Sequence, residues 1–281
     1  MKKYILIITL LFSALCLNLF AQTKSYPFEV IKTGKGKQAI LFIPGFASSG
    51  AVWNETKTAF EKDFTCYTLT MAGFAGAKPH PSSSFENWKA EIATYIKTNK
   101  IEKPIVIGHS MGGGLALALA ADYPDLIGKI VVVDALPCLA ALSNVSFKSK
   151  ENNDCSPMVA QMTAMNETQF YEMQKQAMPR LLQDASKLEM VIDWSVKSDR
   201  KTFAQMYCDF FNTDLRERIS TIKCPSLILL ASNFINLKPA IEEQYKNLKT
   251  ANFQYANKGL HFIMYDDKDW YLAQLNNFIK S

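Results

Sequence analysis

The amino-acid sequence predicts an α/β fold, a mostly parallel sheet flanked by helices, with a helical segment inserted into it. β-rich runs alternate with helical segments along most of the chain, which is the order that successive βα units give. Several runs are apolar at every position, as a strand must be when helices cover both faces of its sheet. The alternation stops between Val133 and Ser226, where helical segments follow one another without a buried strand between them.

Seven strands are expected where β-branched and aromatic residues gather between turn residues. The runs over residues 39–43, 105–107 and 130–133 contain no polar side chain, which is typical of strands at the centre of a parallel sheet. The expected strands are residues 28–32, 38–43, 65–69, 104–108, 129–133, 226–230 and 252–255.

The core helices are expected between these strands, where the apolar residues follow the helical period. Ser84 precedes one of them and is a suitable N-cap, because its hydroxyl can accept a hydrogen bond from a free N–H of the first turn. The expected helices are residues 51–61, 84–98, 111–122, 237–248 and 267–280. Together with the strands they define a core of residues 22–135 and 217–281.

Residues 136–216 form the expected helical insertion, with helices predicted at 158–178, 179–190 and 202–211. Methionines are frequent there, and Met158, Met162 and Met165 fall at positions i, i+4 and i+7, which share one face of a helix. Each of them could serve ordinary core packing. As a group, flexible thioethers also suit an adaptable apolar pocket, so these three are candidate substrate-pocket residues.

Residues 1–21 have the layout of a secretory signal peptide. Lys2 and Lys3 begin it, an apolar run over residues 4–19 follows, and the small Ala21 precedes the expected cleavage site at Ala21-Gln22. An uncleaved membrane anchor is the alternative. Cleavage predicts an exported protein, periplasmic or secreted, with no stable membrane span after processing.

Charge and motif content argue against several classes of protein. The 281 residues carry a formal net charge of +5, which falls to +3 without the two leader lysines, and no Lys/Arg cluster is interleaved with aromatic residues. Nucleic-acid binding is therefore not expected. No metal-ligand spacing or phosphate-binding glycine motif is found, so we expect no metal and no cofactor. The expected partner is a small-molecule substrate, and the sequence does not indicate an oligomeric state.

Five cysteines remain after removal of the leader, an odd number that leaves at least one thiol free in a monomer. Cys138 and Cys155 flank the polar loop of residues 143–154 and could form a disulfide in an oxidising compartment. The alternative is that all five are buried as small hydrophobic side chains.

The chemistry is expected at Ser110, in the G-x-S-x-G sequence of residues 108–112. This sequence directly follows the apolar run 105–107 and directly precedes an Ala/Leu-rich helix, which is the strand–turn–helix setting of a nucleophile elbow. The neighbouring glycines allow helix and strand to approach closely, and the helix N-terminus directs free N–H groups at the site. Ser110 is therefore the predicted nucleophile.

A serine hydroxyl needs a base to become nucleophilic at neutral pH, and the chain offers three histidines. His109 adjoins the nucleophile and should point elsewhere, and His80 lies in a loop fixed by prolines. His261 follows the last expected strand, at the same edge of the sheet as the elbow. His261 is the predicted base.

These motifs resemble the α/β-hydrolase superfamily, in particular its serine hydrolases with a helical cap. The resemblance covers essentially residues 28–281 and rests on the turn at residues 42–46, on residues 108–113 and on residues 260–264. It implies that the fold is the α/β-hydrolase fold and that the insertion is its cap (lid) domain. It also implies an oxyanion hole made of the backbone N–H groups of Phe46 and Met111.

The acid departs from the commonest pattern of that superfamily. Relatives often carry it after the next-to-last strand, but the loop at residues 231–236 contains no carboxylate. Some members carry it one strand beyond the elbow, where this chain has Asp134. Asp134 also keeps the chain order Ser, Asp, His, and it is the predicted acid. Asp214, Asp209 and a triad without a working acid are the alternatives.

The predicted function is that of an exported, carboxylesterase-like serine hydrolase, which cleaves an ester or related acyl bond of a small-to-medium apolar substrate through an acyl-enzyme. One alternative is another reaction on the same fold, such as that of an aminopeptidase, acyltransferase, C–C hydrolase or perhydrolase. The other is a non-catalytic binding protein on the same scaffold.

Overall fold

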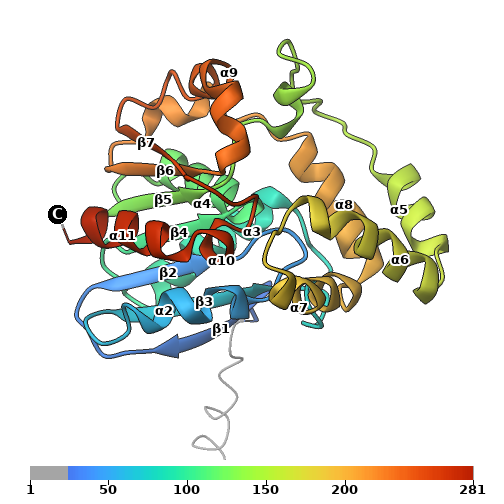
Figure 1. Cartoon of the computed structure of the whole chain (residues 1–281), viewed down its shortest axis with the longest axis horizontal. Coiled ribbons are helices and arrows are strands. Elements are labelled where there is room, and N and C mark those ends of the chain that lie inside the picture. The colour runs from blue at the N-terminus through green and yellow to red at the C-terminus, as the bar shows by residue number, and fades with distance from the viewer. Residues whose placement is uncertain (1–24, 281) are drawn as a thin grey trace, which may run out of the picture.

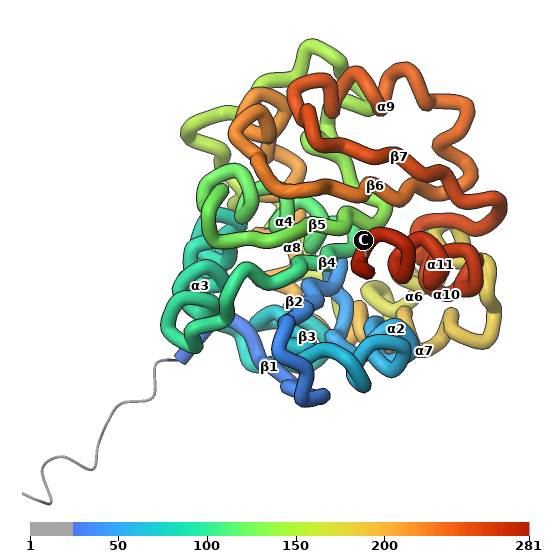
Figure 2. The backbone as a smooth tube through the Cα atoms, turned by 90° about the vertical axis from the view of Figure 1, so that its left-hand side faces the viewer, coloured from blue at the N-terminus to red at the C-terminus, as the bar shows by residue number. Residues whose placement is uncertain are grey.

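The computed structural model describes residues 25–280, and the predicted signal peptide lies outside them. Its centre is one seven-stranded sheet in the order β1-β3-β2-β4-β5-β6-β7 (Figure 2). β1 is antiparallel to β3 and every other pair is parallel, so the predicted mostly parallel sheet is confirmed. The strands are β1 (Phe28–Thr33), β2 (Ala39–Ile43), β3 (Thr65–Met71), β4 (Ile105–His109), β5 (Lys129–Val133), β6 (Ser226–Leu230) and β7 (Ala251–Tyr255).

The central strands are buried along their whole length because helices cover both faces of the sheet. β2, β4 and β6 are buried at every residue, as their apolar runs require, and the polar side chains of His109 in β4 and Ser226 in β6 are buried with them. α3 (Phe85–Thr98), α4 (Met111–Asp122) and α9 (Lys238–Gln244) pack on one face. α2 (Asn54–Thr58), α10 (Ile263–Asp266) and α11 (Lys268–Ile279) pack on the other.

Two core helices are shorter than the sequence predicts. The predicted helix 51–61 is a 3₁₀ turn over Gly50–Trp53 followed by α2, and the predicted helix 237–248 is a 3₁₀ segment over Ser232–Leu237 followed by α9. α3 and α4 match their predicted ranges closely. In α3 the Ser84 hydroxyl accepts a hydrogen bond from the Asn87 N–H, which is the predicted cap.

The insertion consists of helices that lie together at one side of the sheet (Figure 1). They are α5 (Ser156–Ala164), α6 (Glu167–Ala177), α7 (Ala185–Val196) and α8 (Arg200–Phe211). The predicted continuous helix 158–178 is wrong, because Asn166 and Gln169 form a capping box that starts α6 as a separate helix. The predicted helix 179–190 is displaced toward the C-terminus, since Asp184 caps α7. Within residues 25–280 no helix is both long and apolar enough to cross a bilayer.

A disulfide joins Cys155, the N-cap of α5, to Cys208 in α8. The Cys138–Cys155 pair, one of the two possibilities that the sequence left open, is therefore not formed, and the other possibility, in which no cysteine is bridged, is also wrong. Cys138 is a buried free thiol, and its backbone N–H donates to the Gln244 side chain, on the core side of the insertion. The loop before α5 instead runs along α8, where the Asn153 amide donates to the Cys208 carbonyl oxygen.

Candidate active site

Ser110 lies at a sharp turn between β4 and α4. Its backbone has φ 53° and ψ −122°, a left-handed conformation that a non-glycine residue adopts only under strain. The strand and helix approach so closely that a Cβ on Gly108 would lie 2.0 Å from the Gly112 carbonyl oxygen. Ser110 N–H donates to the Val133 carbonyl oxygen at 2.9 Å, which ties the turn to β5. The geometry is that of a nucleophile elbow.

His261 and Asp134 form a direct hydrogen bond, with 2.6 Å between His261 Nδ1 and Asp134 Oδ2. Asp134 follows β5, next to the elbow strand, and is 4% exposed. Its second oxygen, Oδ1, accepts the backbone N–H of Ala231 at 2.7 Å. Both oxygens of the carboxylate therefore have partners, and the one that faces the imidazole fixes the proton of His261 on Nδ1, leaving Nε2 as the acceptor.

The alternative acids are engaged elsewhere. Asp209 accepts the backbone N–H of Phe85 at 2.6 Å, and its burial raises the pKa of the carboxyl above its usual value. Asp214 pairs with Arg216, whose hydrogen bonds outweigh the effect of burial and lower the pKa of that carboxyl. Neither contacts His261. Of the three candidates, only Asp134 is brought to the predicted base.

His109 supports the base loop rather than pointing away from it. Its Nε2 lies 3.0 Å from the His261 carbonyl oxygen, and the two imidazole rings are 4.5 Å apart. Burial, together with the charge that His261 can carry, holds the pKa of His109 well below its usual range. His109 is therefore neutral, and it donates its Nε2 proton to that carbonyl. His80 lies away from the site and accepts the Ser82 N–H.

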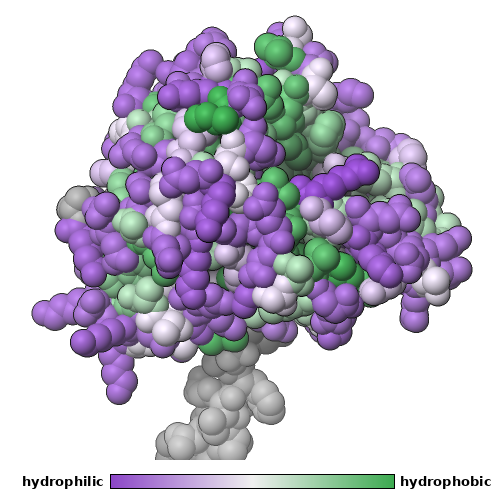
Figure 3. Space-filling view, in the orientation of Figure 1, coloured by the Kyte–Doolittle hydropathy of each residue, from purple (hydrophilic) through white to green (hydrophobic). Residues whose placement is uncertain are grey.

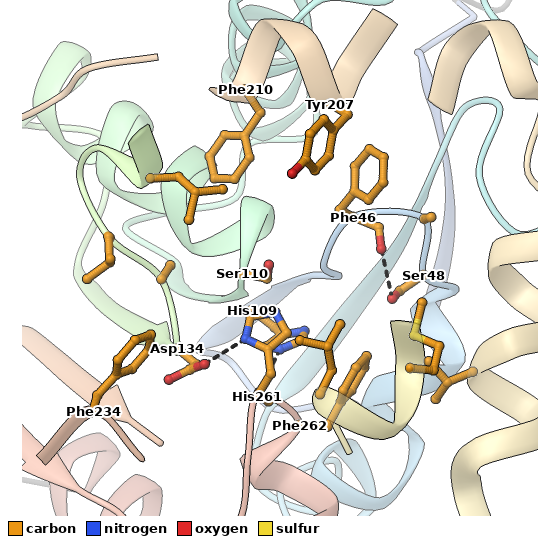
Figure 4. A pocket seen from close by; sticks show the side chains of 17 residues that line it. Phe46, Ser48, His109, Ser110, Asp134, Tyr207, Phe210, Phe234, His261 and Phe262 are labelled. Atoms are coloured by element: carbon orange, nitrogen blue, oxygen red, sulfur yellow. Dashed lines mark hydrogen bonds and ion pairs between the residues drawn. The ribbon is translucent and has the colours of Figure 1, made fainter. Parts of the chain in front are cut away.

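A cavity of about 350 Å³ opens in front of these residues (Figure 4). Its walls are largely apolar and come from both the sheet edge and the insertion. The lining residues are Phe46, Ala47, Ser48, His109, Ser110, Asp134, Ala135, Leu136, Leu139, Met178, Leu181, Val191, Tyr207, Phe210, Phe234, His261 and Phe262. The Ser110 hydroxyl points into this space and makes no hydrogen bond to His261.

The predicted methionine pocket is not part of this cavity. Met158, Met162 and Met165 do not line it, and Met162 and Met165 pack instead against a small cluster that includes Phe170 and Phe203. Because α5 ends at Ala164, Met165 lies outside the helix face that the spacing suggested. The methionine that does line the cavity is Met178, at the end of α6.

The two predicted oxyanion-hole donors lie beside the nucleophile. Phe46 lines the cavity, and Met111 follows Ser110 at the first position of α4. Within residues 25–280 neither backbone N–H donates to a protein acceptor. Both N–H groups are therefore without a protein acceptor, as the predicted oxyanion hole requires. The ring of Phe46 is held by Phe74 and Phe203, with centroids at 5.2 and 4.5 Å.

A second, larger groove of about 710 Å³ lies apart from Ser110 and His261. Its walls combine the loop after β5 with α9, and Leu142, Val145 and Leu237 are exposed there. Figure 3 shows hydrophobic residues gathered in this recess. No group of His, Cys, Asp or Glu side chains in the described part of the chain is arranged to hold a metal ion.

The sequence and structure of the chain were compared with those of known proteins. The model of the alpha/beta hydrolase fold matches residues 38–268. A pimeloyl-(acyl-carrier protein) methyl ester esterase of Vibrio parahaemolyticus is 21% identical over 250 residues, which are 87% of this chain and 95% of the relative. The same kind of enzyme from Vibrio atlanticus is 25% identical over 201 residues, 70% of this chain and 76% of the relative.

Solved structures share the fold at lower identity. The enol-lactonase from Burkholderia xenovorans superposes with a TM-score of 0.75 at 18% identity, over 90% of this chain and 96% of its own. A thermophilic esterase from Thermogutta terrifontis gives a TM-score of 0.76 at 15% identity, over 93% of this chain and 96% of its own.

Proposed function

Because the chain belongs to the α/β-hydrolase family, we propose that it is an exported serine esterase that cleaves an ester or related acyl bond of a small-to-medium apolar substrate. The observation that carries this proposal is the hydrogen bond between His261 Nδ1 and Asp134 Oδ2, at the cavity that Ser110 also lines. Ser110, His261 and Asp134 all line this largely apolar cavity. Their proximity supports the proposal, because acyl transfer by a serine triad needs a nucleophile, a base and an acid in one place.

The reaction begins when the Ser110 hydroxyl turns toward His261 and its oxygen attacks the substrate carbonyl carbon. Nε2 of His261 takes the hydroxyl proton, and Asp134 stabilises the imidazolium that forms. His261 then gives the proton to the leaving alcohol, which departs from the tetrahedral intermediate. A water activated by the same imidazole hydrolyses the acyl-enzyme and regenerates Ser110.

The oxyanion of each tetrahedral intermediate accepts hydrogen bonds from the backbone N–H groups of Phe46 and Met111. A donor already fixed in position needs no reorganisation as the charge develops, and one such donor typically contributes about 10²- to 10³-fold to turnover. The packing of the Phe46 ring supports this role, because it holds the backbone of that turn against α8.

The cavity supports a neutral, apolar acyl substrate. Its volume of about 350 Å³ suits a small molecule, and no lysine or arginine is among the residues that line it. The curated relatives are methyl ester esterases whose names specify a pimeloyl group on acyl-carrier protein, so an ester of a medium-length acyl chain is the substrate class we propose.

Export is supported by the predicted signal peptide and by the Cys155–Cys208 disulfide, because disulfides persist mainly in oxidising compartments. The test is to fractionate cells and determine the N-terminus of the protein. We expect a periplasmic or secreted chain that begins at Gln22. A cytosolic chain that retains residues 1–21 would contradict export.

The enzymatic part of the proposal is tested with p-nitrophenyl esters from acetyl to long acyl chains. We expect hydrolysis that peaks at short or medium chains and is abolished in Ser110→Ala. Ser220→Ala is the matched control and should keep wild-type activity, because Ser220 is exposed and does not line the cavity. Hydrolysis that survives in Ser110→Ala would refute the assignment of the nucleophile.

A further inference from the structure

Tyr207 is a polar residue of the cavity that the proposed mechanism leaves unused. It lies on α8, which belongs to the insertion, and 40% of it is exposed. Its ring packs 5.5 Å from the ring of Phe46 and stacks on Phe211 at 6.2 Å. Within residues 25–280 its hydroxyl makes no hydrogen bond to another residue, so the oxygen is available to a bound molecule.

The helix explains how this side chain is aimed. Phe203, Tyr207 and Phe210 lie at positions i, i+4 and i+7 of α8, which share one face. Phe203 and Phe210 are buried, and they fix the part of the helix from which Tyr207 projects. Figure 4 shows the Tyr207 hydroxyl directed into the cavity, toward the space in front of Ser110. A phenylalanine could make the same ring contacts, so packing alone does not require the hydroxyl.

The other polar side chains of the cavity already have partners or roles. Asp134 and His261 bind each other, and His109 binds the His261 carbonyl oxygen. The Ser48 hydroxyl donates to the Phe46 carbonyl oxygen. His109 Nδ1 also has no hydrogen-bond partner, but that nitrogen is buried. With the nucleophile set aside, the Tyr207 hydroxyl is an unused polar group that points into the open space of the cavity. The absence of lysine and arginine from the lining means that an anionic group would find no charged partner there.

We propose that Tyr207 is a specificity residue that hydrogen-bonds a neutral oxygen of the substrate, in a carbonyl, ether or hydroxyl group near the scissile ester. This inference rests on the proposed function, because it takes the bond attacked by Ser110 as its reference point. A substrate without that oxygen leaves the Tyr207 hydroxyl without its partner in a largely apolar cavity. The discrimination expected from one neutral hydrogen bond is about tenfold.

The test compares esters that differ only by the oxygen. In the acyl series, p-nitrophenyl esters of γ-, δ- and ε-keto acids are matched with isosteres that carry a methyl branch in place of the carbonyl oxygen. In the alcohol series, methoxyethyl esters are matched with butyl esters. We expect wild-type kcat/KM to favour the oxygenated member of at least one pair by about tenfold. The pair that shows it identifies the side of the ester that Tyr207 contacts.

Tyr207→Phe should remove this preference, so that the ratio of kcat/KM between the oxygenated and the alkyl member of the pair approaches one. Tyr171→Phe, which removes a hydroxyl from α6 outside the cavity, is the matched control and should keep the preference. Equal kcat/KM ratios in wild type and Tyr207→Phe, or an equal loss for both members of every pair, would overturn the inference alone. A wild-type protein that hydrolyses no ester would contradict the proposed function, and this inference with it.

Discussion

Replacing Asp134 with asparagine changes the chemistry of the proposed triad while keeping the shape of the side chain. Oδ1 accepts the Ala231 N–H at 2.7 Å, and the asparagine oxygen can keep that bond. The amide nitrogen then occupies the place of Oδ2, which lies 2.6 Å from His261 Nδ1. Because this nitrogen is a donor, Nδ1 must become the acceptor and the imidazole proton moves to Nε2.

The expected size of the effect follows from that change of tautomer. With a proton on Nε2, His261 cannot take the proton of Ser110, and the imidazolium loses the charge of a carboxylate that is only 4% exposed. Loss of this role in a serine triad lowers turnover by about 10⁴-fold, which corresponds to about 5.4 kcal/mol of barrier. Binding should change little, so the loss falls on kcat rather than on KM.

The assay is the steady-state hydrolysis of a p-nitrophenyl ester that the wild-type protein cleaves well. Asp209→Asn is the matched control, because Asp209 also accepts a backbone N–H but does not contact His261. We expect Asp209→Asn to keep near wild-type kcat and both variants to give a cooperative melting transition. Wild-type turnover in Asp134→Asn would refute the assignment of the acid.

Three further predictions concern stability. In Gly112→Ala the new Cβ would lie 2.3 Å from the Ile43 carbonyl oxygen, so the free energy of unfolding should fall by about 1–3 kcal/mol in urea titrations, and an unchanged midpoint would contradict the close approach. Cys208→Ser removes the disulfide that closes a loop of 53 residues, so the free energy of unfolding should fall by about 4 kcal/mol. A non-reducing peptide map of the wild-type protein should show Cys155 linked to Cys208 and Cys138 free. Burial lowers the pKa of His109, so the unfolded chain binds this proton more readily and stability should fall as the pH drops below about 6.5. In His109→Gln that fall in Tm should be smaller, and an identical pH dependence would show that His109 is not its source.

The fold could be predicted because its signals are local. Each central strand contains a run of consecutive apolar residues, and the elbow combines a strand, a glycine-rich turn and a helix within consecutive residues. Ser110 and Asp134 lie within two residues of the end of a predicted strand, and His261 lies in the loop after the last predicted strand. Since parallel strands carry their C-terminal ends to one edge of the sheet, local positions were sufficient to place these three residues together.

The insertion was predicted less well because its contacts are not local. The spacing of Met158, Met162 and Met165 suggested one helix face, but α5 ends before Met165 and the capping box at Asn166 starts a separate helix. Met162 and Met165 pack in a small cluster with Phe170 and Phe203 instead of lining the cavity. The disulfide partner of Cys155 could not be chosen from sequence, because only the tertiary approach of α5 to α8 brings Cys208 within reach.

Residues that line the cavity from the insertion were also missed. The aromatic spacing of Phe203, Tyr207 and Phe210 was a usable signal, since it gives α8 an aromatic face. The spacing does not show whether that face points toward Ser110, because this depends on how the insertion packs on the sheet. The contact of His109 with the His261 carbonyl oxygen was hidden for the same reason.

Labelling by a fluorophosphonate tests directly whether Ser110 is a nucleophile, because the reagent phosphonylates a serine only when its hydroxyl is activated. Wild-type protein and Ser110→Ala, both shown to be folded by circular dichroism, are incubated with the probe and mapped by peptide mass spectrometry. If Ser110 is the activated nucleophile, the wild type should be modified stoichiometrically at Ser110 and the variant not at all. A folded wild-type protein that is not labelled, or labelling that persists in Ser110→Ala, would contradict it.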